Sequence, residues 1–236
     1  MRVLLCGEGP TDYGQRNYES EQWVDGPVQI FIRKIYDGEI EIESIEKKSV
    51  LGLTLGRQFQ GRNLSGHGGK ALKLAILARE KRKDVAACYV DADKSSGESG
   101  SDPVRCKRRF EEVYQEIQRG FEPMAGQVKG LAVVPLKMIE SWLLSDEQAF
   151  VVTFHEAIPK NSTRLTHPEL IWGTESDPQS NHPKCYLRRV LSQYGYEIEG
   201  NLELFCSLAE NSRVEILRSK CSISFEKFYN DMQGIG

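Results

Sequence analysis

The sequence lacks paired cysteines, clustered histidines and long apolar runs. Its six cysteines form no C-x-x-C pair, and its four histidines show no metal-ligand spacing, which argues against a zinc site or a thioredoxin motif. No apolar run approaches the roughly 18–20 residues that cross a bilayer. The strand-like run at 2–6 is also shorter than the roughly 7–15-residue apolar core of a signal peptide. We therefore expect a cytoplasmic protein that has no disulfides and does not bind a membrane.

Nucleotide-binding loops are missing as well. Segment 7–12 is not a dinucleotide fingerprint, because Asp12 stands where the third glycine of G-x-G-x-x-G belongs. Segment 64–71 is not a P-loop, because Leu64 replaces the first glycine and Ala71 replaces the serine or threonine. Lys70, near the start of a predicted helix, is only a weak candidate for a phosphate contact.

The chain carries little excess charge of either sign. Its 31 basic and 34 acidic residues give a net charge of −3, which bears on solubility rather than on any local surface. Basic residues nevertheless gather at 81–83, 105–109 and 184–189. Each of these clusters, taken alone, fits a solvated helix face as well as it fits a nucleic-acid surface.

The first 152 residues alternate between predicted strands and predicted helices. Apolar or alternating runs predict strands at 2–6, 40–45, 85–90 and 131–135. Helical spacing predicts helices at about 22–36, 66–82, 104–119 and 139–151. Strands separated by helices form mainly parallel sheets with right-handed crossovers. We therefore predict an α/β domain at 1–152, in which helices flank a mainly parallel sheet.

The character of the sequence changes beyond residue 152. Residues 155–183 are rich in Pro, Asn, Thr, Ser and His and show little periodicity. Helical segments are predicted near 183–195, 201–210, 212–219 and 222–233. We predict that residues 153–236 form a C-terminal helical extension packed on the sheet domain.

Carboxylates follow two of the predicted strands. Glu8 lies between two glycines just after strand 2–6, and Asp91 and Asp93 follow strand 85–90. The carboxyl ends of such strands meet at one edge of a sheet, and residues two apart on an extended segment point to the same face. One Glu and two Asp can hold a hard cation such as Mg²⁺. For each motif alone, a turn with solvated acids is the alternative.

Glu140 is a further acidic candidate. It follows the strand at 131–135 and opens an otherwise apolar helix. An acid in that place either stabilises the helix dipole or serves a functional site, and the sequence favours neither. Asp146, six residues later, is predicted to be a surface or turn residue.

The order of these motifs resembles a known family. Gly-Glu-Gly-Pro-Thr-Asp at 7–12, followed by Asp91-x-Asp93, is similar to the Toprim domain of topoisomerases, primases and overcoming-lysogenization-defect nucleases. Segments 139–146 (Ile-Glu-Ser-Trp-Leu-Leu-Ser-Asp) and 182–187 (His-Pro-Lys-x-Tyr-Leu) resemble a branch of small stand-alone bacterial Toprim-like proteins, some of them linked to phage defence. The sequence departs from the family at Asp12, where many relatives have Glu, and after Asp93, where no third acid follows.

The resemblance implies a Toprim-like sheet and a nuclease that uses Mg²⁺ or Mn²⁺ as its cofactor. It implies Glu8, Asp91 and Asp93 as catalytic metal ligands and Glu140 as a ligand of a second metal, with Glu8 as a general base in the alternative. DNA is favoured over RNA as the nucleic acid. Phosphate or nucleic-acid contacts are expected from a set of basic residues: Lys94, Lys137, Lys184, Arg105, Arg108 and Arg109.

Two other functions stay open. The protein could be a non-catalytic Toprim-like subunit that binds an ATPase partner or a nucleotide, since related nucleases often carry an ATPase in the same chain. Phosphoryl transfer to a small molecule is the other, because such sites are chemically generic. A topoisomerase is disfavoured because no tyrosine stands in a nucleophile context, and a primase because its zinc and nucleotide-binding elements are not visible.

Overall fold

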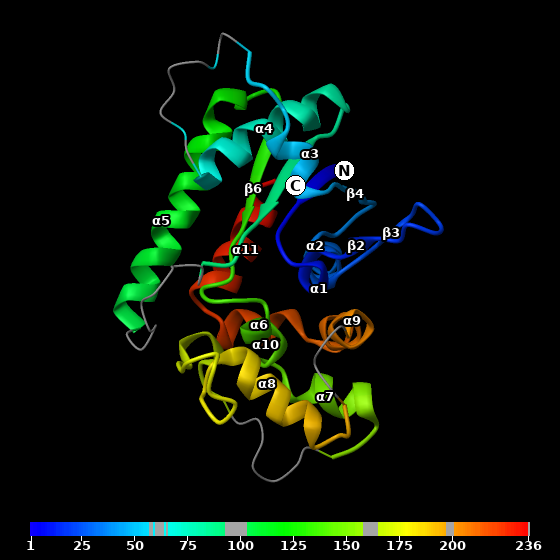
Figure 1. Cartoon of the computed structure of the whole chain (residues 1–236), viewed down its shortest axis with the longest axis vertical. Helices are drawn as coiled ribbons and strands as arrows, with labels where there is room; N and C mark the ends of the chain where they lie inside the picture. The colour runs from blue at the N-terminus through cyan, green and yellow to red at the C-terminus, as the bar shows by residue number, and fades with distance from the viewer. Residues whose placement is uncertain are drawn as a thin grey trace.

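A four-stranded parallel sheet forms the centre of the protein (Figure 1). The computed structural model describes residues 1–56, 59, 64, 66–92, 103–157, 165–196 and 201–235. The sheet has the order β4-β1-β5-β6, and its strands are β1 (Arg2–Cys6), β4 (Glu41–Ser44), β5 (Val85–Tyr89) and β6 (Lys129–Val133). Every neighbouring pair is parallel. The predicted α/β fold, a mainly parallel sheet flanked by helices with a C-terminal helical extension, is confirmed.

Helices cover both faces of this sheet and its carboxyl edge. In chain order they are α1 (Pro10–Tyr13), α2 (Pro27–Ile35), α3 (Lys47–Leu51), α4 (Gly66–Glu80), α5 (Pro103–Phe121), α6 (Glu140–Leu143), α7 (Glu147–Phe154), α8 (Pro183–Ser192), α9 (Leu202–Asn211), α10 (Val214–Lys220) and α11 (Ser224–Gln233), with 3-10 turns η2 (Glu122–Met124) and η3 (Pro168–Leu170). No helix in the described ranges is both long enough and apolar enough to cross a membrane.

Alternate residues of each strand pack against different helices. Val3 and Leu5 of β1 belong to the core that includes α2 and α11. Leu4 and Cys6 belong to the core that includes α4 and α5. Because both faces are covered, the inner strands read in the sequence as continuous apolar runs rather than as alternating ones.

Several boundaries differ from the sequence prediction, most clearly those of β6 and of the first long helix. β6 begins at Lys129, two residues earlier than expected, because Lys129 and Gly130 pair with β5 although neither is apolar. The predicted helix at 22–36 is shorter, because its start is instead β3 (Trp23–Val24), which pairs antiparallel with β2 (Gln15–Arg16). The helix α2 starts only at Pro27, a residue that suits the first helical position.

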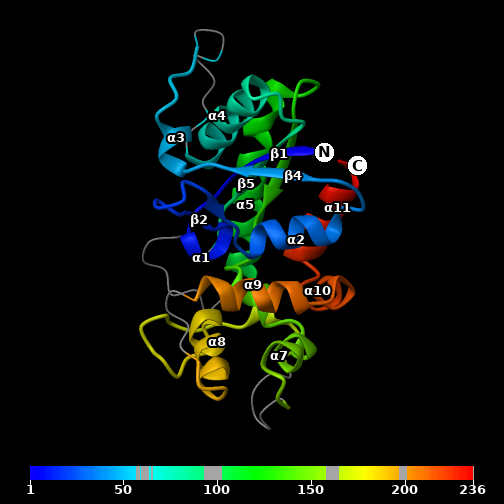
Figure 2. The same cartoon turned by 90° about the vertical axis from the view of Figure 1, so that its right-hand side faces the viewer.

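Helices α7, α8, α9 and α10 form a further layer. Figures 1 and 2 show them together at one end of the molecule, with α9 next to α2, whereas α11 returns to pack against β6 and α2. The domain boundary predicted at residue 152 falls inside α7. The division into 1–152 and 153–236 stays a prediction.

Trp142 of α6 packs against two helices of the core, α2 and α11. Its buried ring makes edge contacts with Phe225 and with Phe31 of α2, at ring-centroid distances of 5.0 and 5.8 Å. It stacks on Phe228 at a centroid distance of 5.6 Å. Its indole N–H donates to Ser224 Oγ at 2.9 Å. One side chain therefore joins α6, α2 and α11, elements that are far apart in the sequence.

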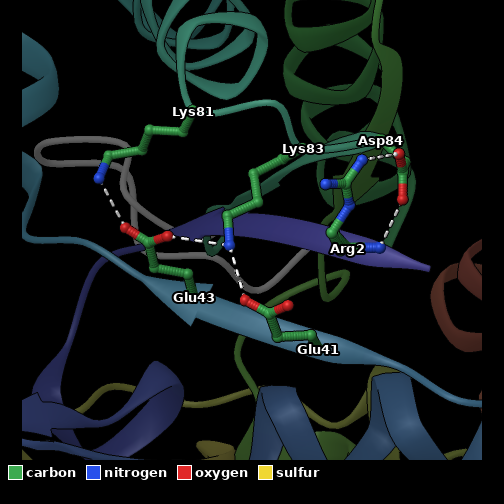
Figure 3. Close-up of polar contacts among 6 residues, drawn as sticks. All are labelled: Arg2, Glu41, Glu43, Lys81, Lys83 and Asp84. Carbon is green, nitrogen blue, oxygen red and sulfur yellow. Dashed lines mark hydrogen bonds and ion pairs between the residues drawn. The ribbon is translucent and has the colours of Figure 1, made fainter.

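An ion-pair network lies at the opposite, amino edge of the sheet (Figure 3). Lys83 lies between Glu41 and Glu43 of β4, at 2.8 and 3.0 Å, and Lys81 reaches Glu43 at 2.7 Å. Burial opposes the charge of Lys83, but its two carboxylate partners raise the pKa above its ordinary value. The basic cluster at 81–83 therefore has a structural role through Lys81 and Lys83, one of the two alternatives that its sequence left open.

Asp146 is a buried cap rather than a surface residue. It is 0% exposed, and its carboxylate accepts from Gln148 N at 3.0 Å, where it caps α7. It also accepts from Arg213 N, Nε and Nη2 at 2.9, 2.8 and 2.7 Å. The prediction of a surface position was wrong because the partner, Arg213 at the start of α10, lies 67 residues away in the chain.

We expect Asp146→Ala to destabilise the protein by about 2–4 kcal/mol, since it removes a helix cap and leaves several N–H donors without their acceptor. Urea unfolding followed by circular dichroism measures this loss. Asp177→Ala is the matched control, because Asp177 also accepts a backbone N–H, that of Gln179 at 2.9 Å, but is exposed. Equal losses in the two variants would contradict the role given to Asp146.

Candidate functional site

The parallel pairing of β1 with β5 brings two predicted acids to one edge of the sheet. Cys6, at the end of β1, lies opposite Cys88, one residue before the end of β5. Glu8 and Asp91 therefore leave the sheet at the same carboxyl edge, as the sequence predicted. Asp93 and Lys94 lie outside the described residues, so their roles stay predictions.

A buried tyrosine joins two carboxylates at this edge. Tyr89, the last residue of β5, is 0% exposed, and its hydroxyl donates to Asp91 Oδ1 at 2.5 Å and contacts Asp12 Oδ2 at 3.1 Å. Asp91 follows Tyr89 by two residues and so lies on the same side of the extended chain. Asp12 comes from α1, so residues 77 positions apart meet at one oxygen atom.

Two glycines allow Asp12 to approach β5 this closely. Gly9 has a φ of 82°, and a Cβ at that residue would lie 2.5 Å from Asp12 Oδ2. A Cβ on Gly7 would lie 2.8 Å from the Tyr13 ring and 2.9 Å from the Tyr89 ring. The Gly-Glu-Gly motif is therefore needed for the packing of α1 against β5.

Glu140 adds a third carboxylate to the same region. It opens α6 and is 8% exposed. Burial, followed by the charge of Asp12, raises the pKa of Glu140 from 4.5 to about 8, and the charge of Lys184 on α8 opposes this rise. The helix dipole alone does not explain such a buried acid, which favours the functional interpretation of Glu140.

The four groups form one electrostatic unit, which we call the acidic cluster: Asp12, Tyr89, Asp91 and Glu140. Burial raises the pKa of Tyr89 well above 10, and the charges of Asp12, Asp91 and Glu140 add to the effect. The phenol therefore stays protonated and acts as a hydrogen-bond donor. The site holds more negative charge than its buried position favours.

Glu8 has a different environment from the acidic cluster. Its Oε1 lies 2.5 Å from Lys47 Nζ of α3 and 3.7 Å from Lys70 Nζ of α4. Lys70 is 3% exposed and donates to the carbonyl oxygen of Tyr89 at 3.3 Å. Lys70, a weak candidate for phosphate in the sequence, thus contacts Glu8 and β5 instead.

The predicted basic contacts are spread over three places. Lys184 faces Glu140 and pairs with Glu175 at 2.9 Å, whereas Lys137 is fully buried, with its Nζ 4.9 Å from the centre of the Trp172 ring. Arg105 and Arg108 are exposed on the first turns of α5, beyond the carboxyl end of β5. Arg108 and Arg109 share Glu112 at 3.7 and 3.5 Å, which offsets part of their charge.

Sequence reasoning missed two members of the cluster, Asp12 and Tyr89. Asp12 stood inside the first motif but was treated only as a departure from the family pattern. Tyr89 stood two residues before Asp91, and that spacing on a strand places both on one face. The alternation could therefore have identified Tyr89, whereas nothing local to Asp12 showed that it meets Tyr89.

The donor chemistry of the acidic cluster fits a hard divalent cation. Carboxylate oxygens are the ligands that Mg²⁺ and Mn²⁺ prefer, and a buried excess of negative charge is relieved by a cation. Across the part of the chain that the structure describes, no group of three or more His, Cys, Asp or Glu lies close enough to hold an ion. Asp12, Asp91 and Glu140 are among these described residues, so the three do not form a complete ligand set here. The shared site of Glu8, Asp91 and Asp93 stays a prediction, because Asp93 lies outside the described residues.

Comparisons with known proteins do not extend this description. No family model, no curated protein and no solved structure matches the chain. The resemblance to Toprim domains rests on the motifs quoted above.

We expect Glu140→Gln to stabilise the ion-free protein at high pH. Burial favours the protonated acid, so the stability that Glu140 contributes is fully present below pH 4.5 and is lost as pH rises through its folded pKa of about 8. The variant stays neutral, so its advantage should be near zero at pH 4.5 and reach a few kcal/mol at pH 8.

Urea unfolding in EDTA at the two pH values measures this difference. Glu215→Gln, at an exposed position of α10, is the control and should stay within about 0.5 kcal/mol of wild type. A Glu140→Gln variant that is less stable than wild type at pH 8 would contradict the raised pKa.

Proposed function

We propose that this protein is a Toprim-like nuclease that cleaves nucleic-acid phosphodiesters with Mg²⁺ or Mn²⁺. The observation that carries the proposal is that Asp12 and Asp91, from two separate segments, meet at the buried hydroxyl of Tyr89, and that the charge of Glu140 also acts on this hydroxyl. The carboxylates of this region bring like charges close together in a largely buried place. Such a concentration is typical of sites that bind a cation and act on phosphate.

The residues of the acidic cluster have separable tasks in this proposal. Asp12 and Asp91 would hold the cation, with Asp93 as a further ligand and Glu140 as the candidate ligand of a second cation. When bound, the ion supplies charge neutralisation at the scissile phosphate and lowers the pKa of a water molecule. Glu8, held by Lys47 and Lys70 at the same edge, is retained as the candidate general base.

The basic residues around the edge would bind the phosphate backbone. Lys184 lies at the cluster on one side, and the first turns of α5 carry exposed Arg105 and Arg108. Phosphate contacts of this kind supply affinity without sequence preference. We propose DNA as the first substrate to test, a cytoplasmic location, a role in phage defence and an ATPase as the candidate partner protein.

The decisive test compares wild type with Asp91→Asn on single- and double-stranded DNA and RNA, with Mg²⁺, Mn²⁺ or EDTA. Asn keeps the shape of Asp but loses the charge that attracts a cation. We expect cleavage by wild type that depends on the ion, and a loss of about 100-fold or more in the variant. Asp37→Asn, an exposed acid at the opposite end of the sheet, should cleave like wild type.

Melting temperatures provide a reading that does not need turnover. An ion present at about 100 times its Kd should raise the melting temperature of wild type and of Asp37→Asn by about 5–10 °C, and that of Asp91→Asn far less. If wild type shows neither cleavage nor a shift in melting temperature, with and without an ATPase, the nuclease proposal is wrong. The non-catalytic subunit is then the favoured function.

Reversal of charge on α5 should weaken DNA binding. We expect Arg105→Glu with Arg108→Glu to raise the Kd at least about 10-fold and to reduce the slope of log K against log salt by about 2, since two phosphate contacts are lost. The control is Arg79→Glu with Arg82→Glu, the same change of charge on exposed residues near the amino edge. Fluorescence anisotropy at several salt concentrations measures the Kd and the salt slope of each double variant. Equal effects of the two double variants would indicate that Arg105 and Arg108 belong to a solvated helix face.

A further inference from the structure

Tyr89 occupies an unusual position for a core residue. Its ring belongs to the core between the sheet and α2, and it is 0% exposed. Its hydroxyl nevertheless reaches two carboxylates, Asp91 at 2.5 Å and Asp12 at 3.1 Å. The shorter distance is that of a charge-assisted O–H···O⁻ bond, which is stronger and more directional than a neutral one.

The backbone of Tyr89 connects to the other half of the site. Its carbonyl oxygen accepts from Lys70 Nζ at 3.3 Å, and the same Nζ lies 3.7 Å from Glu8 Oε1. One residue therefore contacts the acidic cluster through its hydroxyl and the partner of Glu8 through its carbonyl.

We propose that Tyr89 is a positioning residue: its hydroxyl holds the Asp12 and Asp91 carboxylates at a fixed separation, so that they meet an incoming divalent cation already oriented. The inference rests on the proposed function. Without the hydroxyl, the carboxylates of Asp12 and Asp91 lose the polar group that both contact, and their like charges favour a wider separation. Hydrogen-bond partners behind metal ligands typically account for about 10–100-fold in metal affinity or activity.

A core role alone would need only the aromatic ring, and a second tyrosine makes this distinction testable. Tyr13 is 7% exposed and packs beside Tyr89 under Gly7. Its hydroxyl makes its hydrogen bond with the backbone of Lys47. Tyr13→Phe and Tyr89→Phe thus each remove one buried hydroxyl from the same layer, but only the second removes a donor to Asp91.

The test measures Mn²⁺ binding by calorimetry in wild type, Tyr89→Phe and Tyr13→Phe, with circular dichroism and melting in EDTA to confirm that each is folded. We expect Tyr89→Phe to raise the Kd for Mn²⁺ about 10-fold or more and Tyr13→Phe to leave it within about 2-fold. In cleavage assays Tyr89→Phe should require more Mn²⁺ for half-maximal rate, with a smaller change in the rate at saturation.

A double-mutant cycle makes the mechanism specific. If Tyr89 acts by linking the two acids, Asp12→Asn and Tyr89→Phe should affect Mn²⁺ affinity non-additively, because each already breaks the same link. Equal Mn²⁺ affinity of wild type and Tyr89→Phe, or an equal loss in Tyr13→Phe, would overturn the positioning role while the proposed function stands. Wild type that binds no Mn²⁺ and cleaves nothing would instead overturn the proposed function, and the positioning role with it.

Discussion

The aromatic contacts of Trp142 are the interaction on which the site depends. The indole packs on Phe31, Phe225 and Phe228 and donates to Ser224, which positions α6 against α2 and α11. Glu140 is two residues before Trp142 in the same short helix, so the contacts of Trp142 also position Glu140 at the carboxyl edge. Burial of large aromatic rings is among the strongest favourable terms in folding, which allows it to hold a charged residue in a place that desolvation disfavours.

The two edges of the sheet carry different arrangements of charged residues. At the amino edge three basic residues meet three acidic ones, Asp84, Glu41 and Glu43, and each of these three carboxylates has a cationic partner (Figure 3). At the carboxyl edge Asp12, Asp91 and Glu140 concentrate negative charge, while Lys184 supplies opposite charge nearby. At the carboxyl edge, burial and then the charge of Asp12 raise the pKa of Glu140, so this arrangement disfavours the charged form of that acid.

The contrast between Glu8 and Asp91 shows why a shared edge is not a shared site. Both acids leave parallel neighbouring strands, yet Glu8 is held by Lys47 and Lys70 from the helices on one side. Asp91 lies with Tyr89 and Asp12 on the side of α1 and α6. Tyr89 contacts both groups of residues. Its carbonyl oxygen accepts from Lys70, and its hydroxyl contacts Asp12 and Asp91.

Local pattern determined the α/β class, the approximate strands and the edge at which Glu8 and Asp91 emerge, because the period of a strand and the direction of parallel pairing are properties of short segments. The same alternation places Tyr89 on the same face of the strand as Asp91. Tertiary structure alone decided that Asp12 meets Tyr89, that Glu140 is buried and that Asp146 pairs with Arg213. These contacts join residues far apart in the chain, and their geometry follows from how helices pack over the sheet rather than from any neighbouring residue.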